Sequence, residues 1–139
     1  MVQEHWLRKD NLSNLALLND KCSYYGVSGM DDVACNGLLR GRPFGGVAIL
    51  WNTSVVRKVN VIGSGSSGPC AAIKVVFGDY SILVINVYFL CFRVSADYIH
   101  DVHECLGYIE SLLANDVYAD EFICGDFNFP LEFILDRRA

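Results

Sequence analysis

Short apolar runs separated by turn residues dominate the middle of the chain and predict a series of consecutive β-strands. The runs cover residues 46–51, 55–62, 70–77 and 81–89. The last two are joined by Gly78-Asp79, a pair typical of a hairpin turn. The run at 81–89 is almost continuously apolar, which is typical of a strand buried on both faces. Consecutive strands joined by short turns favour antiparallel pairing.

Helical periodicity is found in two segments. Leu12, Leu15 and Leu18 recur at helical spacing and predict a short helix near residues 11–19. Between residues 95 and 115 the apolar positions share one helical face, which predicts a long amphipathic helix. Ser95 is a suitable N-cap for that helix.

The remaining segments complete the order of the elements. Residues 2–7 are typical of the end of a strand. Residues 24–41 are mixed and rich in Gly, Asp and Ser, so they predict a loop. Residues 122–124 predict one more short buried strand. The order helix, strands, helix, strand indicates an α/β (α+β) layered sandwich.

Composition narrows the class of protein. The 139 residues fit one domain, and 53% hydrophobic with 19% charged residues excludes intrinsic disorder. A net charge of −5 argues against non-specific nucleic-acid binding through a positively charged coat, but it allows an acidic site whose charge a metal ion offsets. The N-terminal residues lack a secretory pattern and the longest apolar run is too short for a bilayer, so we expect an intracellular protein with no membrane partner.

The six cysteines contain no pair separated by two residues, so they form neither a zinc knuckle nor a dithiol redox motif. Four of them sit in or beside apolar runs, and we expect these to be buried free thiols. They are Cys70, Cys91, Cys105 and Cys124.

Candidate chemistry lies where polar residues follow or interrupt apolar strands. Asp126 and Asn128 follow the strand at 122–124, and their spacing of two places both on the same side of an extended chain. A carboxylate and a carboxamide together suit proton transfer or phosphate positioning. Gly125-Asp126-Phe127-Asn128 is equally the composition of an ordinary turn, and the tetrapeptide alone favours the turn.

Three further polar residues have two interpretations each. Glu4 is either an oxygen ligand for Mg²⁺, which needs only one or two protein carboxylates, or a surface glutamate. Asn86 and Tyr88 interrupt the most apolar strand two residues apart. They are either hydrogen-bonded core residues or part of a site at the end of that strand.

Other patterns favour structural interpretations. The glycines of Gly63–Gly68 match the dinucleotide-binding spacing but precede a strand, so they predict a hairpin loop. His100 and His103 match no zinc-binding helix motif and predict a solvated helix face. A third set of residues forms either a modest phosphate-binding patch or a solvated turn. This set comprises Arg40, Arg42, Arg57 and Lys58.

Four motifs in a fixed order carry a family resemblance. They are Gln3-Glu4-His5-Trp6-Leu7, the segment 41–51 (GRPFGGVAILW), Asn86-Val87-Tyr88 and Gly125-Asp126-Phe127-Asn128. Together they resemble the endonuclease/exonuclease/phosphatase superfamily, in particular the apurinic-endonuclease-like domain of non-LTR (LINE-type) retrotransposons. The resemblance extends from residue 3 to about residue 129. It implies a DNase I-like, four-layer α/β/β/α sandwich, incomplete in this chain.

The resemblance also implies roles for individual residues. Glu4 matches the glutamate that binds Mg²⁺, with Mn²⁺ as an alternative ion. Tyr88 matches the tyrosine that contacts the scissile phosphate. Asp126 matches the aspartate that orients or deprotonates the attacking water, and Asn128 matches the asparagine that fixes the phosphate.

The chain departs from the family pattern in three places. It begins after the position of an asparagine that the family carries upstream of the glutamate. No serine-aspartate-histidine segment follows Asn128, and Leu90 stands where the family often has proline. We therefore expect residues 1–139 to be a partial domain, truncated at both ends, with weak activity and with exposed edges that lower its solubility.

The resemblance implies a Mg²⁺-dependent endonuclease that nicks DNA by phosphodiester hydrolysis. Its implied partner is DNA, its implied location is the nucleus, and such a domain is normally joined to a reverse transcriptase. Two alternatives remain open. One is a phosphatase or phospholipase of the same superfamily, because fold-level similarity does not separate these activities. The other is a catalytically dead remnant or a non-catalytic binding fragment.

Overall fold

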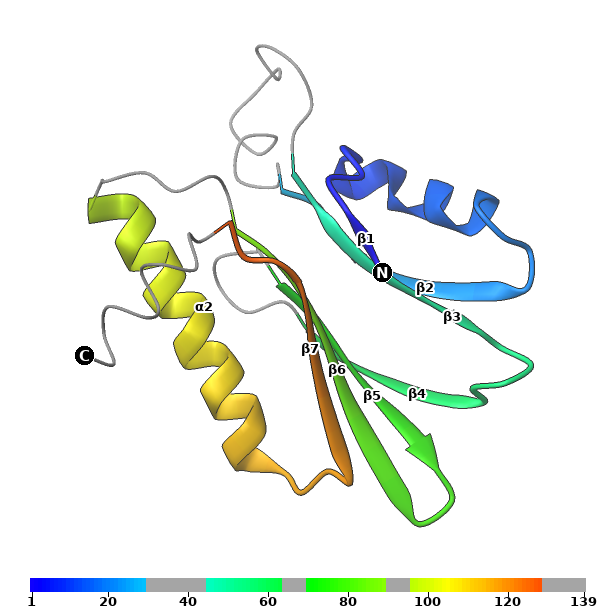
Figure 1. Ribbon diagram of the computed structural model, residues 1–139. Helices are drawn as coiled ribbons and strands as arrows, with labels where there is room; N and C mark the ends of the chain where they lie inside the picture. The colour runs from blue at the N-terminus through cyan, green and yellow to red at the C-terminus, as the bar shows by residue number, and fades with distance from the viewer. Residues whose placement is uncertain (30–44, 64–69, 90–95, 129–139) are drawn as a thin grey trace.

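The fold contains two β-sheets with a helix outside each (Figure 1). The computed structural model describes residues 1–29, 45–63, 70–89 and 96–128. In chain order the elements are β1 (Val2–Gln3), the 3₁₀ helix η1 (Lys9–Leu17), β2 (Cys22–Val27), β3 (Val47–Asn52), β4 (Lys58–Gly63), β5 (Cys70–Phe77), β6 (Tyr80–Tyr88), α2 (Ala96–Asn115) and β7 (Asp120–Asp126). The class is therefore α+β, as the order of predicted elements indicates.

The strands divide between two sheets. Sheet A has the order β1-β3-β2 and sheet B the order β4-β5-β6-β7. All pairs are antiparallel except β6 and β7, which run parallel. Two parallel neighbours cannot be joined by a tight turn, and α2 provides the long connection between them. The predicted antiparallel pairing is thus confirmed for β4, β5 and β6.

Sheets A and B pack face to face through one hydrophobic cluster. Val47 and Ile49 of sheet A meet Ala71, Ile73 and Val75 of sheet B, and all five side chains are buried. These residues occupy alternate positions along β3 and β5, because successive side chains of a strand point to opposite faces. The predicted near-continuous apolar strands follow from this packing, since sheet B is covered on both faces.

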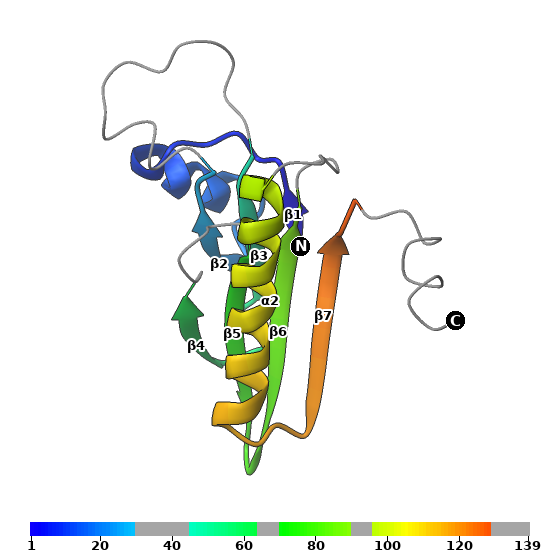
Figure 2. The same ribbon diagram turned by 90° about the vertical axis from the view of Figure 1, so that its left-hand side faces the viewer.

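The other face of sheet B carries α2 (Figure 2). Val102, Cys105, Ile109 and Leu112 are buried, at the spacing of three and four that places side chains on one helical face. They pack against the intervening positions of the strands, such as Leu83, which is fully buried. The predicted helix at 95–115 is confirmed, and Ser95 lies outside the described residues.

The outer face of sheet A is covered by η1. Leu15 is buried there, and a Cβ added to Gly26 would stand 2.6 Å from its Cδ1 atom. Gly26 therefore makes room for the leucine. The short helix predicted near 11–19 is present as a 3₁₀ helix. Part of the predicted loop at 24–41 is wrong, because β2 extends to Val27, where the β-forming aromatic residues of β2 outweigh its glycine; residues 30–41 lie outside the described residues.

Three strand predictions and one cysteine prediction also need correction. Residues 4–7 do not continue the predicted strand, because β1 ends at Gln3 and the backbone turns at Glu4 and Trp6, which have positive φ. Strand β4 begins at Lys58 rather than residue 55, and β7 spans Asp120–Asp126 rather than 122–124. Cys70 and Cys105 are buried as predicted, but Cys124 is exposed. The physical reason is that β7 is the last strand of sheet B among the described residues and lies beyond the part that α2 covers, so its side chains are left uncovered (Figure 2). Cys91 lies outside the described residues.

The far end of α2 is attached to sheet B by a polar contact. The Lys74 ammonium of β5 donates to the carboxylate of Asp116 and lies 5.6 Å from the centre of the Tyr118 ring. The lysine holds the pKa of the Asp116 carboxyl below its usual range. This contact fixes the connection between α2 and β7. No helix among the described residues has both the length and the apolar character needed to cross a bilayer.

We expect Ile73→Ala to destabilise the protein by about 2–5 kcal/mol, because it removes a side chain from the centre of the cluster between the sheets. Urea unfolding followed by circular dichroism measures the change. The matched control is Val55→Ala, since Val55 is 68% exposed. Equal losses in the two variants would contradict the assignment of the core.

We expect Ile123→Lys to reduce self-association, because Ile123 is 40% exposed on the open edge of β7 and a charge there opposes strand pairing. Sedimentation velocity measures the change in oligomer content. Val117→Lys is the control, since Val117 is apolar and 89% exposed but lies outside the strand. An equal effect of both variants would assign the association to general hydrophobicity rather than to the edge.

Candidate functional site

The carboxyl ends of β1, β6 and β7 meet at one end of the two sheets. The Nε2 atom of Gln3, the last residue of β1, donates to the Val87 carbonyl of β6 over 3.0 Å. Tyr88 ends β6 and is the register partner of Asp126, which ends β7. Glu4 directly follows Gln3, so the structure brings all of these chain segments to the same end.

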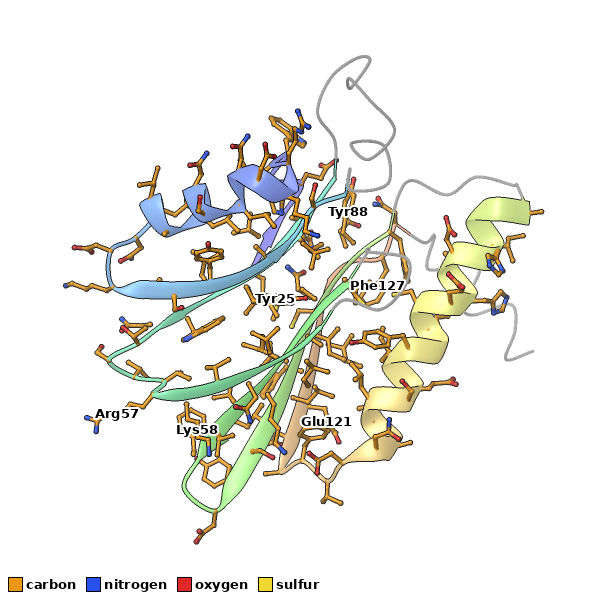
Figure 3. All side chains as sticks on the ribbon, turned by 180° about the vertical axis from the view of Figure 1, so that it is seen from behind. Tyr25, Arg57, Lys58, Tyr88, Glu121 and Phe127 are labelled. Carbon is orange, nitrogen blue, oxygen red and sulfur yellow. The ribbon has the colours of Figure 1, made fainter. Side chains whose placement is uncertain are left out.

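Tyr88 and Asp126 project from the same face of sheet B. Register partners on neighbouring parallel strands share a face, and the strands lie about 4.8 Å apart. Tyr88 packs against the cluster between the sheets, so this shared face is the one that faces sheet A. In Figure 3, Tyr88 lies at the opposite end of the molecule from Arg57 and Lys58.

Asn128 is held against the ends of β6 and β7. Its carboxamide nitrogen donates to the Phe89 carbonyl, and its backbone N–H donates to Asp126 Oδ1 over 3.0 Å. The Phe89 N–H in turn donates to the Asp126 carbonyl over 2.9 Å. Of the two predicted interpretations, the structure shows the turn, because Asp126 Oδ1 accepts from the Asn128 backbone N–H and Asn128 has φ +47°.

A glycine allows β7 to approach β6 closely at this end. Gly125 has φ +154°, and an added Cβ would lie 1.8 Å from the Val87 carbonyl oxygen. Any side chain at this position would force the two strand ends apart. Steric exclusion of any side chain therefore explains why glycine stands at the first position of the Gly125–Asn128 motif.

Glu4 stands in an unusual backbone conformation at the rim of the site. Its side chain is exposed, its φ is +51°, and its N–H donates to the Gly46 carbonyl over 2.8 Å. Trp6 repeats this arrangement, with φ +59° and an N–H donated to the Gly45 carbonyl. These two backbone hydrogen bonds to Gly45 and Gly46 fix the backbone position from which the Glu4 side chain extends.

The His5 ring attaches the segment of residues 4–7 to β2, and both of its ring nitrogens form hydrogen bonds. Its Nδ1 accepts from the Leu7 N–H over 3.0 Å, so Nε2 carries the proton and donates to the Val27 carbonyl over 2.9 Å. A Cβ on Gly46 would stand 2.3 Å from the imidazole, so only glycine leaves room for the ring. Burial lowers the pKa of His5 from its usual value, an effect opposed by the hydrogen bond to Val27.

Backbone strain gathers at this end of the sheets. Among the described residues, Glu4, Trp6 and Asn128 are the only non-glycine residues with positive φ. Each such conformation costs on the order of 1–3 kcal/mol and persists where the surrounding structure imposes it. Strain of this kind clusters at functional sites, so it is a second, independent reason to place a site here.

Asn86 is a hydrogen-bonded core residue. It is fully buried, its Nδ2 atom donates to the carbonyls of Val2 and Ala48, and its Oδ1 accepts from Gln3. Of its two predicted interpretations, the structure supports the satisfied core residue. The supporting residues Gln3 and His5 were not predicted; the polar interruption at Asn86 was the available signal, since a buried amide requires partners.

Other predicted features do not join this site. Arg57 and Lys58 lie at the opposite end of the sheets, because Lys58 pairs with Val76 near the β5–β6 hairpin, and Arg40 and Arg42 lie outside the described residues. The predicted phosphate-binding patch is therefore not formed by Arg57 and Lys58 beside Gly46. His100 and His103 occupy the exposed face of α2, as predicted. Gly63 ends β4, and residues 64–69 lie outside the described residues.

Glu4 and Asp126 are the carboxylates at this end of the sheets that could serve as ligands for Mg²⁺. Glu4 and Asp126 offer two exposed carboxylates at the same end, and one oxygen of Asp126 is engaged by a backbone N–H. Mg²⁺ takes oxygen ligands and typically binds through one or two carboxylates together with water. Within the described part of the chain no group of three or more His, Cys, Asp or Glu residues is found. Two carboxylates are within the number of protein ligands that Mg²⁺ uses when water supplies the rest.

Comparison with known proteins adds no family assignment. No protein-family model matches the chain, and no curated protein matches it. The fold class, two facing sheets with outer helices, and the geometry at the carboxyl ends of β1, β6 and β7 therefore carry the functional argument.

We expect acid to destabilise the protein through His5. The folded pKa lies below the unfolded value of 6.5, so His5 imposes no penalty above that value and stability is lost as the pH falls from 6.5 toward the folded pKa. Urea unfolding at pH 7.5 and 5.5, in EDTA, measures the difference, which His5→Gln should reduce. His100→Gln, on the exposed helix face, should leave it unchanged; the reverse pattern would contradict the role of His5.

Proposed function

We propose that the chain is part of a Mg²⁺-dependent endonuclease of the DNase I-like, endonuclease/exonuclease/phosphatase type, and that it hydrolyses phosphodiester bonds of DNA. The observation that supports the proposal most directly is the convergence of Glu4, Tyr88, Asp126 and Asn128 on the carboxyl ends of three strands. These residues come from positions up to 124 residues apart (128 minus 4) in the sequence. The layer order η1, sheet A, sheet B, α2 agrees with the proposed fold type.

Each residue has a chemical role in this proposal. The Asp126 carboxylate accepts a proton from the attacking water, which forms the new bond to phosphorus as the bond to the leaving sugar oxygen breaks. The carboxamide of Asn128 has two N–H donors, of which one binds the Phe89 carbonyl and the other serves a phosphate oxygen. The Tyr88 hydroxyl donates a hydrogen bond to a second phosphate oxygen.

Glu4 would hold the metal ion, and Asp126 lies at the same end of the two sheets. A bound Mg²⁺ offsets the negative charge that develops on the phosphate oxygens during hydrolysis. The fixed Glu4 backbone, bonded to Gly46, restricts the positions that the carboxylate reaches. Preorganised groups of this kind lower the barrier because they need no rearrangement during the reaction.

The test uses protein in excess over supercoiled plasmid, where one nick per plasmid is detected as open-circular DNA. We expect nicking with Mg²⁺ and none with EDTA. Glu4→Gln and Asp126→Asn should each reduce the single-turnover rate by about a hundredfold, because the first weakens the metal site and the second removes the proton acceptor for the attacking water.

Two charge-matched controls accompany these variants. Asp120→Asn changes a carboxylate at the other end of β7, and Glu104→Gln changes one on the surface of α2. Both should nick at the unmodified rate. Loss of activity in the controls, or Mg²⁺-independent activity that survives Glu4→Gln, would contradict the proposal, and hydrolysis of a phosphoinositide in preference to DNA would redirect it to the phosphatase branch.

A further inference from the structure

We propose that Gln3 and Asn86 form a positioning pair that sets the distance between Glu4 on one sheet and Tyr88 and Asp126 on the other. The kinetic part of this inference rests on the nuclease function proposed above. The geometry behind it is independent, because it concerns how the two sheets are fixed relative to each other at one end.

The pair connects sheet A with sheet B through four hydrogen bonds. Gln3 Nε2 donates to Asn86 Oδ1 over 3.1 Å and to the Val87 carbonyl over 3.0 Å. Asn86 Nδ2 donates to the carbonyls of Val2 and Ala48, each over 2.9 Å. Every N–H of the two carboxamides therefore has an acceptor on the opposite sheet.

The orientation of both amides follows from these partners. Val2, Ala48 and Val87 each present a carbonyl oxygen, which accepts only from the nitrogen side of an amide. Reversing the Asn86 amide would set its oxygen against two carbonyl oxygens and leave the buried N–H groups without acceptors. Because Asn86 is fully buried, unpaired N–H groups would lower the stability of the folded state, so a single amide orientation is favoured.

The hydrogen bonds of Gln3 and Asn86 add a directional constraint that the neighbouring apolar contacts between the sheets lack. Val47, Ile49 and Ile73 attract the sheets to each other, but the hydrophobic effect is non-directional. Small relative shifts therefore cost little in the apolar part of the interface. The amides impose a distance and an angle, and the register partner of Asn86 is the fully buried Ala71, whose small side chain leaves room for the amide to reach across.

The pair lies directly beside the candidate catalytic groups. Gln3 precedes Glu4, and Asn86 lies two residues before Tyr88 on the same face of β6. A shift of the sheets at this point would displace the Glu4 carboxylate relative to Asp126. A misplacement of about 1 Å among reacting groups can reduce a rate by roughly a hundredfold.

The test compares Gln3→Met, Asn86→Leu and the double variant with Val75→Ala, a control that removes apolar volume elsewhere between the sheets. We expect Gln3→Met to lower the maximal single-turnover nicking rate by at least about tenfold with the half-saturating protein concentration unchanged, whereas Val75→Ala retains the unmodified rate. The double variant should be more stable than Asn86→Leu alone, because fewer amide groups are left unpaired, and should remain slow. Recovery of both the stability and the single-turnover rate in the double variant would overturn the inference.

Amide hydrogen exchange keeps this test separate from that of the nuclease function. The Glu4 N–H is bonded to Gly46, and we expect it to exchange faster in Gln3→Met and at the unmodified rate in Val75→Ala. If the unmodified chain neither nicks DNA nor binds Mn²⁺, the proposed function fails and the exchange result alone decides the positioning role. Unchanged Glu4 exchange in Gln3→Met would overturn that role whatever the activity.

Discussion

The relative position of the two sheets at the candidate site depends on the hydrogen bonds made by the buried carboxamide of Asn86. This carboxamide lies between sheets A and B, fully buried, and its N–H groups reach backbone carbonyls of β1 and β3. Strand β1 is only two residues long, so its two pairs with β3 hold it weakly. The bonds from Asn86 and Gln3 attach it to sheet B as well. Without them Glu4 would follow a strand end with few constraints on its position.

Close backbone approach is the second feature of this end of the molecule. Gly46 accommodates the His5 ring, and Gly125 accommodates the Val87 carbonyl. These glycines bring the segments carrying Glu4 and Asp126 nearer to their neighbours than residues with side chains could come. The positive φ angles of Glu4, Trp6 and Asn128 occur beside them. Strain and tight packing therefore coincide with the candidate catalytic groups, while the apolar interior of the sheets is regular.

The opposite features are found on β7. Its inner edge is fixed to β6 along seven register pairs, yet Phe122, Ile123 and Cys124 are exposed. The helix α2 covers the centre of sheet B, and β7 lies beyond it (Figure 2). The same strand thus delivers Asp126 to the site and presents an open, apolar edge. This explains why the sequence pattern at 122–124, read as a buried strand, is only half right.

By itself the sequence determined the elements that follow from local periodicity. The apolar runs in β3, β5 and β6 and the helical face of α2 were readable because period two and period 3.6 reflect which side chains face a core. It also offered Glu4, Tyr88, Asp126 and Asn128 as candidates, because polar residues follow or interrupt apolar runs there and because the motifs that contain them resemble those of a nuclease family. Only the tertiary structure decided that β2 is a strand under η1, that Cys124 is exposed, and that Arg57 lies at the opposite end of the molecule from Tyr88. Those outcomes depend on which strands become neighbours, and neighbours are set by long-range contacts, such as that between Gln3 and Asn86, that no local pattern contains.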